Sequence, residues 1–385
     1  MNRRNSFSPL FALVLMLAFT SADARAQAVS SVFATGLKQP TKIIITPKGN
    51  LIVSEVGTGN NDGRVSIIDS SGNRRTLVDG LPSGVGPDGP TGPSGLALRG
   101  RTLYVTIGEG DSLLSGPAGS RLPNLESSPL FSSLLAIRFD PSFETATGDF
   151  ALTADDFVDL ENGAKLKAKN PEGRKVVVDV VANFRNFEDD PRPDAPGNVR
   201  NSNPFGVAVD GNKLYVVNAG LNLVREIDIA TGDSRVVARF APKPNPLPFG
   251  PPVAEAVPDS IRVFGNQLLV TLLTGFPFAP GLAEVRKINL ANDSQATFIG
   301  GLTSAIDVLA FRGPKGEDQF FTLEFSTNLL ANAPGRLQLF SSAGAAPVVI
   351  TGNLITPTSM ARDEQTGNLF VTEIGTGRVI RIAVP

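Results

Sequence analysis

The sequence predicts an all-β fold, a six-bladed β-propeller whose ring is closed by its own N-terminal strand. Three observations lead to this prediction: a strand motif that recurs along the chain, a high content of turn-forming residues, and a last repeat that ends one strand short. The 385 residues include 39 glycines and 30 prolines. Such a composition is typical of many short strands joined by turns.

The recurring motif is clearest near the two ends of the chain. Residues Gly49–Gly59 read GNLIVSEVGTG, and Gly367–Gly377 read GNLFVTEIGTG. The copies are spaced by about fifty residues, except for one interval of about twice that length, and this period is typical of propeller blades. Weaker copies begin at Leu103, Leu214, Leu268 and Phe320.

Each copy predicts four antiparallel strands in the same order. In the fourth repeat the first strand is Pro258–Val263, the second begins at Leu268, and the third and fourth are Val285–Ile288 and Ala296–Ile299. A proline often opens the first strand, where its missing N–H removes no hydrogen bond from the ladder. Four strands in one repeat make one blade.

The last repeat predicts how the ring closes. It ends at Pro385, directly after its third strand, Val379–Ile382. Near the other end of the chain, Val32–Leu37 (VFATGL) resembles Thr76–Leu81 (TLVDGL), a fourth strand with its exit turn. We therefore expect the N-terminal strand to complete the last blade, which removes an exposed sheet edge.

The doubled interval covers residues of about 140–200. This segment holds a polar, acidic stretch at Thr153–Asn162, a basic stretch at Lys165–Lys175, and Val176–Val180, which we expect to be the fourth strand of the second blade. It has no second-strand motif of its own. We therefore predict one domain over 29–385 with a solvated insertion at about 140–200, and six blades rather than the alternative of seven.

Residues 1–28 have the features of a secretory signal peptide. Arg3 and Arg4 precede an apolar run, Leu10–Phe19, which is too short to span a membrane. Alanines at alternate positions predict cleavage within 24–28. We expect a secreted or periplasmic protein, the alternative being a retained N-terminal anchor, and no later segment predicts a membrane span.

The composition excludes several classes of site. The chain has 0 histidines and 0 cysteines, which excludes Ser-His-Asp catalysis, thiol catalysis, disulfides and thiolate zinc sites. Any bound metal has to be a hard cation held by oxygen. The formal net charge of −2 gives a nucleic acid no basic surface to bind.

Several strings suggest a family. They include Gly92–Gly95 (GPSG), Ser202–Gly206 (SNPFG) and Thr274–Phe278 (TGFPF). With the repeats, they resemble the ScyD/ScyE family of exported bacterial proteins, and the chain is more distantly similar to NHL-repeat and gluconolactonase-type six-bladed propellers. The resemblance implies a propeller, export, and an accessory role in secondary-metabolite (pigment) biosynthesis.

The candidate site follows from the blade geometry. In an antiparallel blade the first strand begins where the second ends, so both ends lie on one face of the ring. Polar loop residues and a Phe-Pro-Phe loop on this face could contact a ligand, or they could form a solvated rim and a packed apolar plug. The predicted ligand-binding residues are Glu55, Glu109, Asn203, Asn218, Asp259, Phe276, Phe278, Glu324 and Glu373.

Three of these carboxylates suggest a metal site. Glu55, Glu324 and Glu373 follow equivalent strands in blades that become consecutive when the ring closes, and no Lys or Arg adjoins them in sequence. Close carboxylates attract a cation, and oxygen ligands suit Ca²⁺. The gluconolactonase-type resemblance also implies a Ca²⁺ site here, although Phe205 stands where that family has an asparagine.

Two functions remain open at this point. The first is a monomeric, exported, non-catalytic propeller that binds a small molecule, a glycan or a protein partner. The second is a periplasmic, Ca²⁺-dependent hydrolase of the lactonase type that uses carboxylates. The absence of histidine favours the first, because it removes the most common general base.

Overall fold

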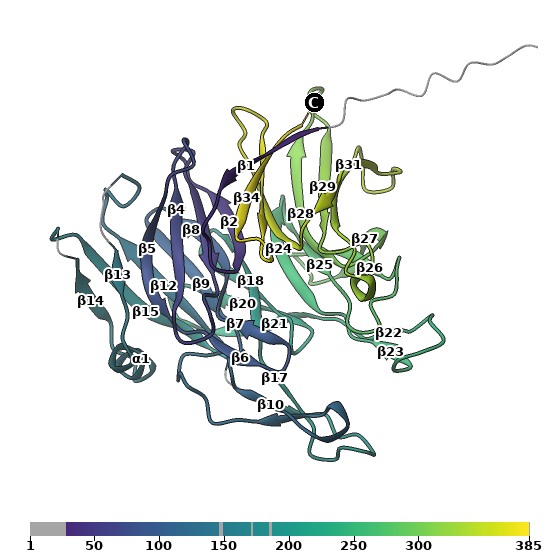
Figure 1. Cartoon of the computed structure of the whole chain (residues 1–385), viewed down its shortest axis with the longest axis horizontal. Coiled ribbons are helices and arrows are strands. Elements are labelled where there is room, and N and C mark those ends of the chain that lie inside the picture. The colour runs from purple at the N-terminus through teal and green to yellow at the C-terminus, as the bar shows by residue number, and fades with distance from the viewer. Residues whose placement is uncertain (1–27, 146–148, 171, 185–186, 385) are drawn as a thin grey trace, which may run out of the picture.

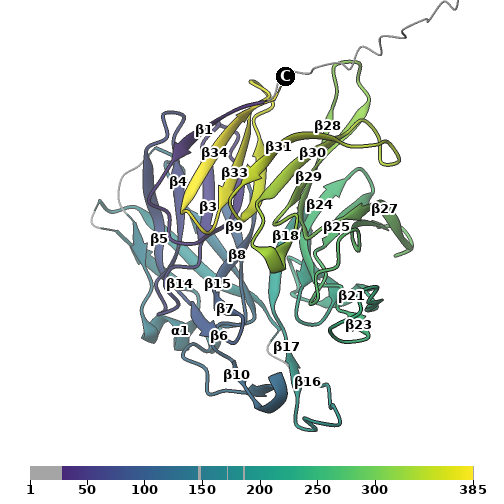
Figure 2. The same cartoon turned by 45° about the vertical axis from the view of Figure 1, so that its right-hand side comes forward.

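The computed structural model describes residues 28–145, 149–170, 172–184 and 187–384. Six antiparallel sheets are arranged around a central axis as a propeller, as predicted, and Figures 1 and 2 show them from two directions. The described segments leave no sheet for a seventh blade. The first strand of each blade faces the axis and contacts the first strands of its neighbours.

Blades 1 to 3 come from the N-terminal half of the chain. Their strands, from the axis outwards, are β2 (Pro40–Ile45), β3 (Leu51–Glu55), β4 (Gly63–Ile68) and β5 (Arg74–Leu81) in blade 1; β8 (Pro93–Arg99), β9 (Thr102–Ile107), β12 (Ser133–Phe139) and β15 (Lys175–Asn183) in blade 2; and β18 (Pro204–Asp210), β19 (Lys213–Asn218), β20 (Leu223–Asp228) and β21 (Ser234–Arg239) in blade 3.

Blades 4 to 6 follow in the same order. Their strands are β24 (Pro258–Phe264), β25 (Gln267–Leu272), β26 (Ala283–Asn289) and β27 (Gln295–Leu302) in blade 4; β28 (Ala305–Arg312), β29 (Asp318–Glu324), β30 (Gly335–Phe340) and β31 (Val348–Leu354) in blade 5; and β32 (Pro357–Arg362), β33 (Leu369–Glu373), β34 (Arg378–Ala383) and β1 (Val29–Ala34) in blade 6.

Strand β1 closes the ring. It runs antiparallel to β34, with Val29 opposite Ala383 and Val32 opposite Ile380, and Figure 1 shows the two strands side by side. The predicted closure is therefore confirmed: the last blade takes its outermost strand from the start of the chain. Pairing of this kind leaves no free edge on β34.

Hydroxyl groups join neighbouring blades near the axis. Thr106 Oγ1 in blade 2 donates to the carbonyl oxygen of Phe205 in blade 3 at 2.8 Å. Thr358 Oγ1 in blade 6 donates to the carbonyl oxygen of Pro40 in blade 1 at 3.0 Å. Each bond satisfies a buried backbone acceptor across a seam that has no ladder of its own.

The segment between β12 and β18 is packed rather than only solvated, which corrects the expectation for its acidic stretch. It contains helix α1 (Ala154–Glu161), which begins with a capping box between Thr153 and Asp156. The helix buries Phe157 and Leu160 in the core of blades 1 and 2. These two apolar residues are three apart and so lie on one helix face. Two short strands extend the blades: β13 (Phe150–Ala151) pairs with β5, and β14 (Leu166–Lys169) pairs with β15.

Short hairpins project from one end of the ring, where the inner strands begin. We name this end the proline rim, because Pro40, Pro93, Pro204, Pro258 and Pro357 open inner strands there. Hairpins at this end lie at the bottom of Figures 1 and 2. They are β6 (Gly84–Gly86) with β7 (Gly89–Thr91), β10 (Leu113–Ser115) with β11 (Arg121–Pro123), β16 (Phe187–Asp189) with β17 (Val199–Asn201), and β22 (Lys243–Pro244) with β23 (Val253–Ala254).

Among the described residues, two single-turn 3-10 helices lie at Pro117–Gly119 and Leu329–Ala331. Within the described residues, no helix is long and apolar enough to cross a membrane.

Candidate functional site

A pocket of about 420 Å³ lies on the proline rim between blades 2, 3 and 4. Its walls come from the loop after β9, the hairpins that contain β11 and β17, and the loops next to β19 and β24. Two of the predicted ligand-binding residues, Glu109 and Asn203, line it together. The pocket is thus the place where the structure brings part of the predicted site together.

Glu109 is held in the pocket by the backbone on either side of it. Gly110 has a positive φ of 59°, and a Cβ atom at this position would collide with the ring of Phe131. Only glycine fits such a position without strain. On the other side, Asn203 Oδ1 accepts a hydrogen bond from the backbone N–H of Glu109 at 3.4 Å. The loop therefore has little freedom to withdraw the Glu109 side chain.

The carboxylate of Glu109 has no partner of its own. The residue is only 8% exposed, and among the described residues no hydrogen bond or ion pair reaches its carboxylate. Burial raises the pKa of Glu109 to about 7; the nearby Asp88 carboxylate adds to this rise and Arg121 opposes it. A buried carboxyl group that titrates near neutral pH is typical of functional sites.

Glu109 lacks the contacts that glutamates of other blades make, because it lies at a different position relative to the end of its second strand. In blade 1, Glu55 stands opposite Pro40 at the end of the second strand. In blade 2 the residue opposite Pro93 is Ile107. Glu109 therefore lies two residues beyond the position that Glu55 occupies, and it takes no part in the contacts that Glu55 makes.

The glutamates at this position in blades 1, 5 and 6 make the same kinds of contact. Each glutamate accepts a hydrogen bond from a backbone N–H in the loop before its inner strand, which fixes that loop to the blade. The donors are Lys38 to Glu55 at 2.5 Å, Thr303 to Glu324 at 2.6 Å and Ile355 to Glu373 at 2.7 Å. In blade 3, Asn218 Oδ1 does the same for the N–H of Asn203 at 3.0 Å. These predicted site residues thus fix loops, and Asn218 lies behind the pocket rather than in it.

Each of the three glutamates also has its own arginine, which corrects the argument for a shared cation. In blades 1 and 5 the arginine is the second residue of the third strand and follows a glycine, and in blade 6 it is the first residue of that strand. In all three blades the strand register places the arginine opposite the glutamate. The pairs are Glu55 with Arg64 at 2.7 Å, Glu324 with Arg336, and Glu373 with Arg378 at 2.7 Å. Among the residues that the structure describes, no group of three or more acidic side chains could hold a metal ion.

Three arginines that the sequence does not single out line the pocket, namely Arg121, Arg192 and Arg200. Arg121 on β11 contacts Asp88 at 2.6 Å, and Arg200 on β17 contacts Glu255 at 3.1 Å. Both come from the short hairpins of the rim. No repeat or motif in the sequence marks these hairpins, so the repeat pattern could not have predicted them.

Amide side chains form another part of the wall. Asn198 Oδ1 accepts a hydrogen bond from the backbone N–H of Arg121 at 2.6 Å, and Asn201 donates to Ser112. With Asn203 they place three amides around the opening. Amides and arginines offer both donors and acceptors, which suits a ligand rich in polar groups.

Phe276 and Phe278 do not line this pocket, although their loop contacts Glu255, which does. Their loop follows β25 and bonds to the segment before β24: the N–H of Gly275 donates to the carbonyl oxygen of Glu255 at 2.8 Å. Phe276 is 48% exposed, and its ring centroid lies 6.4 Å from that of Phe249 and 6.1 Å from that of Phe278. The alternative of a fully packed plug therefore does not describe Phe276.

Asp259 lies elsewhere, among buried polar groups of the inner strands. The centre of this group is Asp307 on β28, which is 0% exposed and contacts Arg262 at 2.7 Å and Lys42 at 3.5 Å. Burial alone would raise the pKa of Asp307, but the Arg262 and Lys42 charges outweigh it and lower that pKa. Burial lowers the pKa of Lys42 to about 8. Burial also raises the pKa of Asp259, whose Oδ2 atom has no hydrogen-bond partner among the described residues.

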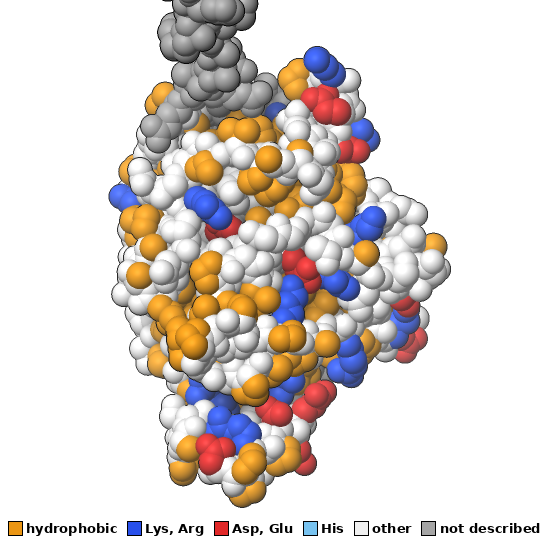
Figure 3. Space-filling view, turned by 90° about the vertical axis from the view of Figure 1, so that its right-hand side faces the viewer, with side chains coloured by type: hydrophobic (Ala, Val, Ile, Leu, Met, Phe, Trp, Pro, Cys, Tyr) orange, Lys and Arg blue, Asp and Glu red, His pale blue; other side chains and the backbone are white. Residues whose placement is uncertain are grey.

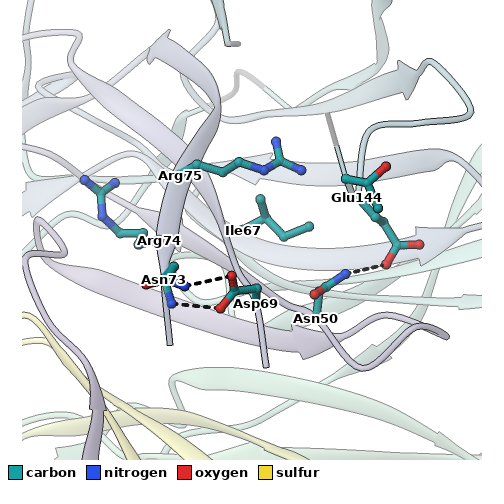
Figure 4. Close-up of a pocket in the computed structure, with 8 residues that line it drawn as sticks. Asn50, Ile67, Asp69, Asn73, Arg74, Arg75 and Glu144 are labelled. Carbon is teal, nitrogen blue, oxygen red and sulfur yellow. Dashed lines mark hydrogen bonds between the residues drawn. The ribbon is translucent and has the colours of Figure 1, made fainter. Parts of the chain in front are cut away.

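A second pocket, of about 410 Å³, lies at the edge of blade 1. Figure 4 shows Glu144 accepting a hydrogen bond from Asn50 at 3.1 Å, and Asp69 accepting two from Asn73. Arg75 donates to the carbonyl oxygen of Phe143. The polar groups named here bond to one another or to the backbone, whereas the rim pocket contains the Glu109 carboxylate, which has no partner among the described residues, so this pocket is the weaker candidate.

A third pocket, of about 440 Å³, lies between blades 5 and 6 and is lined by Glu373 and Arg378, which pair with each other.

The surface around blades 4 and 5 carries charged groups of both signs (Figure 3). Figure 3 views the molecule from that side and shows apolar, basic and acidic side chains mixed over the visible face. Large single-sign surfaces are what favour nucleic acid or membrane partners. The pocket at the proline rim, which contains Glu109, is therefore the strongest candidate for a binding site.

No protein-family model and no curated protein matches the chain. Among solved structures it is similar to a Thermus thermophilus protein described as a candidate oxidoreductase (glucose dehydrogenase), with 13% identity, a TM-score of 0.47, and coverage of 92% of this chain and 99% of the other. A streptogramin B lyase gives 12% identity and a TM-score of 0.46, covering 93% of this chain and 99% of the other. A nidogen/laminin complex gives 10% and 0.44, covering 87% and 98%. Likeness at this level carries no argument about function.

Proposed function

We propose that the protein is a non-catalytic, exported binding protein that holds a small polar molecule in the pocket of the proline rim. The observation that carries this proposal is the carboxylate of Glu109. It is buried, unpartnered among the described residues and lines a pocket, whereas the rim glutamates of blades 1, 5 and 6 are bound to loop N–H groups and arginines. Burial disfavours the charged form of such a group, and a bound ligand that pairs with the carboxylate would favour it.

The size and lining of the pocket support a small molecule. A volume of about 420 Å³ lies within the range of about 300–1,000 Å³ that is usual for small-molecule sites. Arginines, carboxylates and amides line it, and these groups bond to a polar ligand. The exposed Phe276 beside Glu255 adds an apolar contact for a ligand that extends out of the pocket.

A blocking variant tests the proposal. Ala219 lines the pocket and is half-buried, so Ala219→Trp would fill the space with an indole ring. Ala346 lies on an exposed loop before β31, which makes Ala346→Trp the matched control. The probes are small polyols, amines and carboxylic acids at millimolar concentration, and the readout is the melting temperature.

We expect at least one probe to stabilise the wild type and Ala346→Trp but not Ala219→Trp. A ligand at a hundredfold excess over its Kd adds about 2.7 kcal/mol to the free energy of unfolding. If none of the three probe classes stabilises the wild type, or if every probe stabilises Ala219→Trp as much as it stabilises the wild type, the pocket is not the binding site.

Export rests on residues 1–28, of which 1–27 lie outside the described part of the chain. We propose that this segment is a signal peptide cut within 24–28. The charged start and the apolar run Leu10–Phe19 support this. Mass spectrometry of the protein secreted by a bacterial host would detect the shortened chain, and a protein that keeps residue 1 would contradict it.

A finer role follows only from the family resemblance. We propose an accessory role in secondary-metabolite (pigment) biosynthesis, as the resemblance to ScyD/ScyE proteins implies. The support is the set of strings GPSG, SNPFG and TGFPF. SNPFG contains the pocket residue Asn203, and TGFPF forms the loop after β25. Deletion of the gene in its host, followed by measurement of the pigment content of the cells, tests this role; an unchanged content would contradict it.

A further inference from the structure

Among the described residues that line the rim pocket, the acidic residue Glu109 has no cation to pair with. Each of two lining arginines already has its own carboxylate: Arg121 contacts Asp88 at 2.6 Å and Arg200 contacts Glu255 at 3.1 Å. Glu109 has no such counter-ion among the described residues. The negative charge of an ionised Glu109 is therefore left for whatever occupies the pocket.

The remaining charged groups of the wall do not change this balance. Arg192 contacts Asp194 at 3.7 Å and its Nη2 donates to the carbonyl oxygen of Ala118 at 2.9 Å, while its buried Nε–H has no hydrogen-bond partner among the described residues. Asn198 Nδ2 donates to the carbonyl oxygen of Asp190 at 3.0 Å and approaches its carboxylate at 3.5 Å. Among the described lining residues, no cation is directed at Glu109 within ion-pair distance.

We infer that the ligand of the rim pocket is a small organic cation, a primary ammonium whose charge pairs with Glu109 and whose hydroxyl-bearing body bonds to the asparagine amides. This inference rests on the proposed function and specifies the chemical class of its ligand. A charged hydrogen bond to a buried carboxylate is about twice as strong as a neutral one.

Other ligand classes fit less well. An anion would have to approach Glu109 and Asp88 and compete with carboxylates that already hold Arg121 and Arg200. A metal ion needs several oxygen ligands, whereas no group of three acidic residues is present among the described residues. A neutral polyol could bond to the amides but would leave the Glu109 charge uncompensated.

Binding of a cation at Glu109 has to be linked to protons. The pKa of Glu109 is raised to about 7, so below neutral pH the free pocket holds a proton that an ammonium ion would displace. The groups that face Glu109 are Asp88 and Arg121, and the rest of the pocket's charge comes from Asp190, Arg192, Arg200 and Glu255. Affinity should rise up to tenfold per pH unit below pH 7 and level off above it.

Three probes that share one carbon skeleton separate the classes. Glucamine, glucitol and gluconate are six-carbon polyols that carry an ammonium, a hydroxyl and a carboxylate group at the same end of the chain. Calorimetric titration of each probe into the full-length protein gives its Kd. The variants are Glu109→Gln, which keeps the size of the side chain, and Glu317→Gln, a control on blade 5 outside the pocket.

We expect glucamine to bind at least tenfold more tightly than glucitol and gluconate, and this preference to disappear in Glu109→Gln but not in Glu317→Gln. The pH dependence of glucamine binding between pH 5.5 and pH 7.5 should also disappear in Glu109→Gln. Melting curves of both variants establish that they are folded.

The possible failures can be told apart. If glucitol or gluconate binds as tightly as glucamine and Ala219→Trp abolishes that binding, the pocket is a binding site but the inferred ligand class is wrong. If glucamine binds equally well to wild type and Glu109→Gln, the inference is likewise overturned. If no probe class binds in a way that depends on Ala219, the proposed function itself fails.

Discussion

Glu109 links the binding site to the stability of the protein. Its folded-state pKa of about 7 is above the ordinary value of 4.5, so between these two values the folded protein binds more protons at this site than the unfolded chain does. Its contribution to stability is therefore fully present below about pH 4.5 and is lost as the pH rises through about 7. A pKa difference of this size corresponds to at most about 3 kcal/mol.

We predict that Glu109→Gln raises the melting temperature at pH 8 and changes it little at pH 5. Glutamine has no charge to bury, so the penalty that the wild type carries above pH 7 disappears. Thermal denaturation of both proteins at the two pH values measures this. A variant that melts below the wild type at pH 8 would show that the Glu109 carboxylate is well compensated in the free protein.

Asp307, unlike Glu109, is buried among groups that bond to its carboxylate. It is buried among Arg262, Lys42, Ser260 and Ser359, which all bond or pair with its carboxylate. Removing one partner of a buried ion pair leaves the other charge uncompensated and costs about 3–5 kcal/mol. We predict a loss of this size in the free energy of unfolding of Asp307→Ala, measured by denaturant titration.

The control for that variant is Asp318→Ala in the same blade. Asp318 pairs with Arg312 at 3.1 Å on the surface, where an ion pair contributes about 0–1 kcal/mol. If the two variants lose the same stability, the polar group around Asp307 does not hold the inner strands together.

The rim glutamates give a prediction about calcium. Glu55, Glu324 and Glu373 are each bound to an arginine and a loop N–H in their own blade. We therefore predict that millimolar calcium leaves the melting temperature of the wild type unchanged. A calcium-dependent rise that Glu55→Gln abolishes would restore the metal site predicted from the sequence.

At the scale of elements, β1 is the strand on which ring closure depends. It pairs with β34 along its length, and Arg64 Nη2 donates to the carbonyl oxygen of Gly36 just after it at 3.2 Å. We predict that a chain beginning at residue 35 loses several kcal/mol of stability relative to a chain beginning at residue 28, because β34 becomes an exposed edge. Equal denaturation midpoints for the two chains would contradict this.

The sequence predicted the strands because their repeat carries a strong period, and it predicted β1 because Val32–Leu37 resembles other fourth strands. It did not predict α1, because only Phe157 and Leu160 mark the buried face of this short, acidic helix. The ion pairs of the rim were also missed. A Gly-Arg pair stands at the start of β4, β30 and β34, but only the strand register shows that each arginine lies opposite a glutamate.

At the scale of the whole molecule, the ring is a repeated frame from which blades 2 and 4 depart, since Ile107 and Leu272 stand where the other blades have a glutamate or an asparagine. Equivalent rim positions fix loops in blades 1, 3, 5 and 6, whereas blade 2 has Ile107 at that position and carries Glu109 beyond it. The sequence predicted Glu109 and Asn203 from their place after and before strands. It could not predict Arg121 and Arg200, because they reach the pocket from irregular hairpins that follow no repeat.

The most direct test of this account is the pKa of the Glu109 carboxyl group, measured by carbon-13 NMR of glutamate-labelled protein with and without saturating glucamine. The Glu109→Gln variant identifies the resonance by its loss. We predict a pKa near 7 in the free protein, falling when the ammonium ligand is bound because the cation favours the ionised carboxylate. An ordinary pKa in the free protein that glucamine leaves unchanged would contradict both the unpartnered carboxylate and the site that we have built on it.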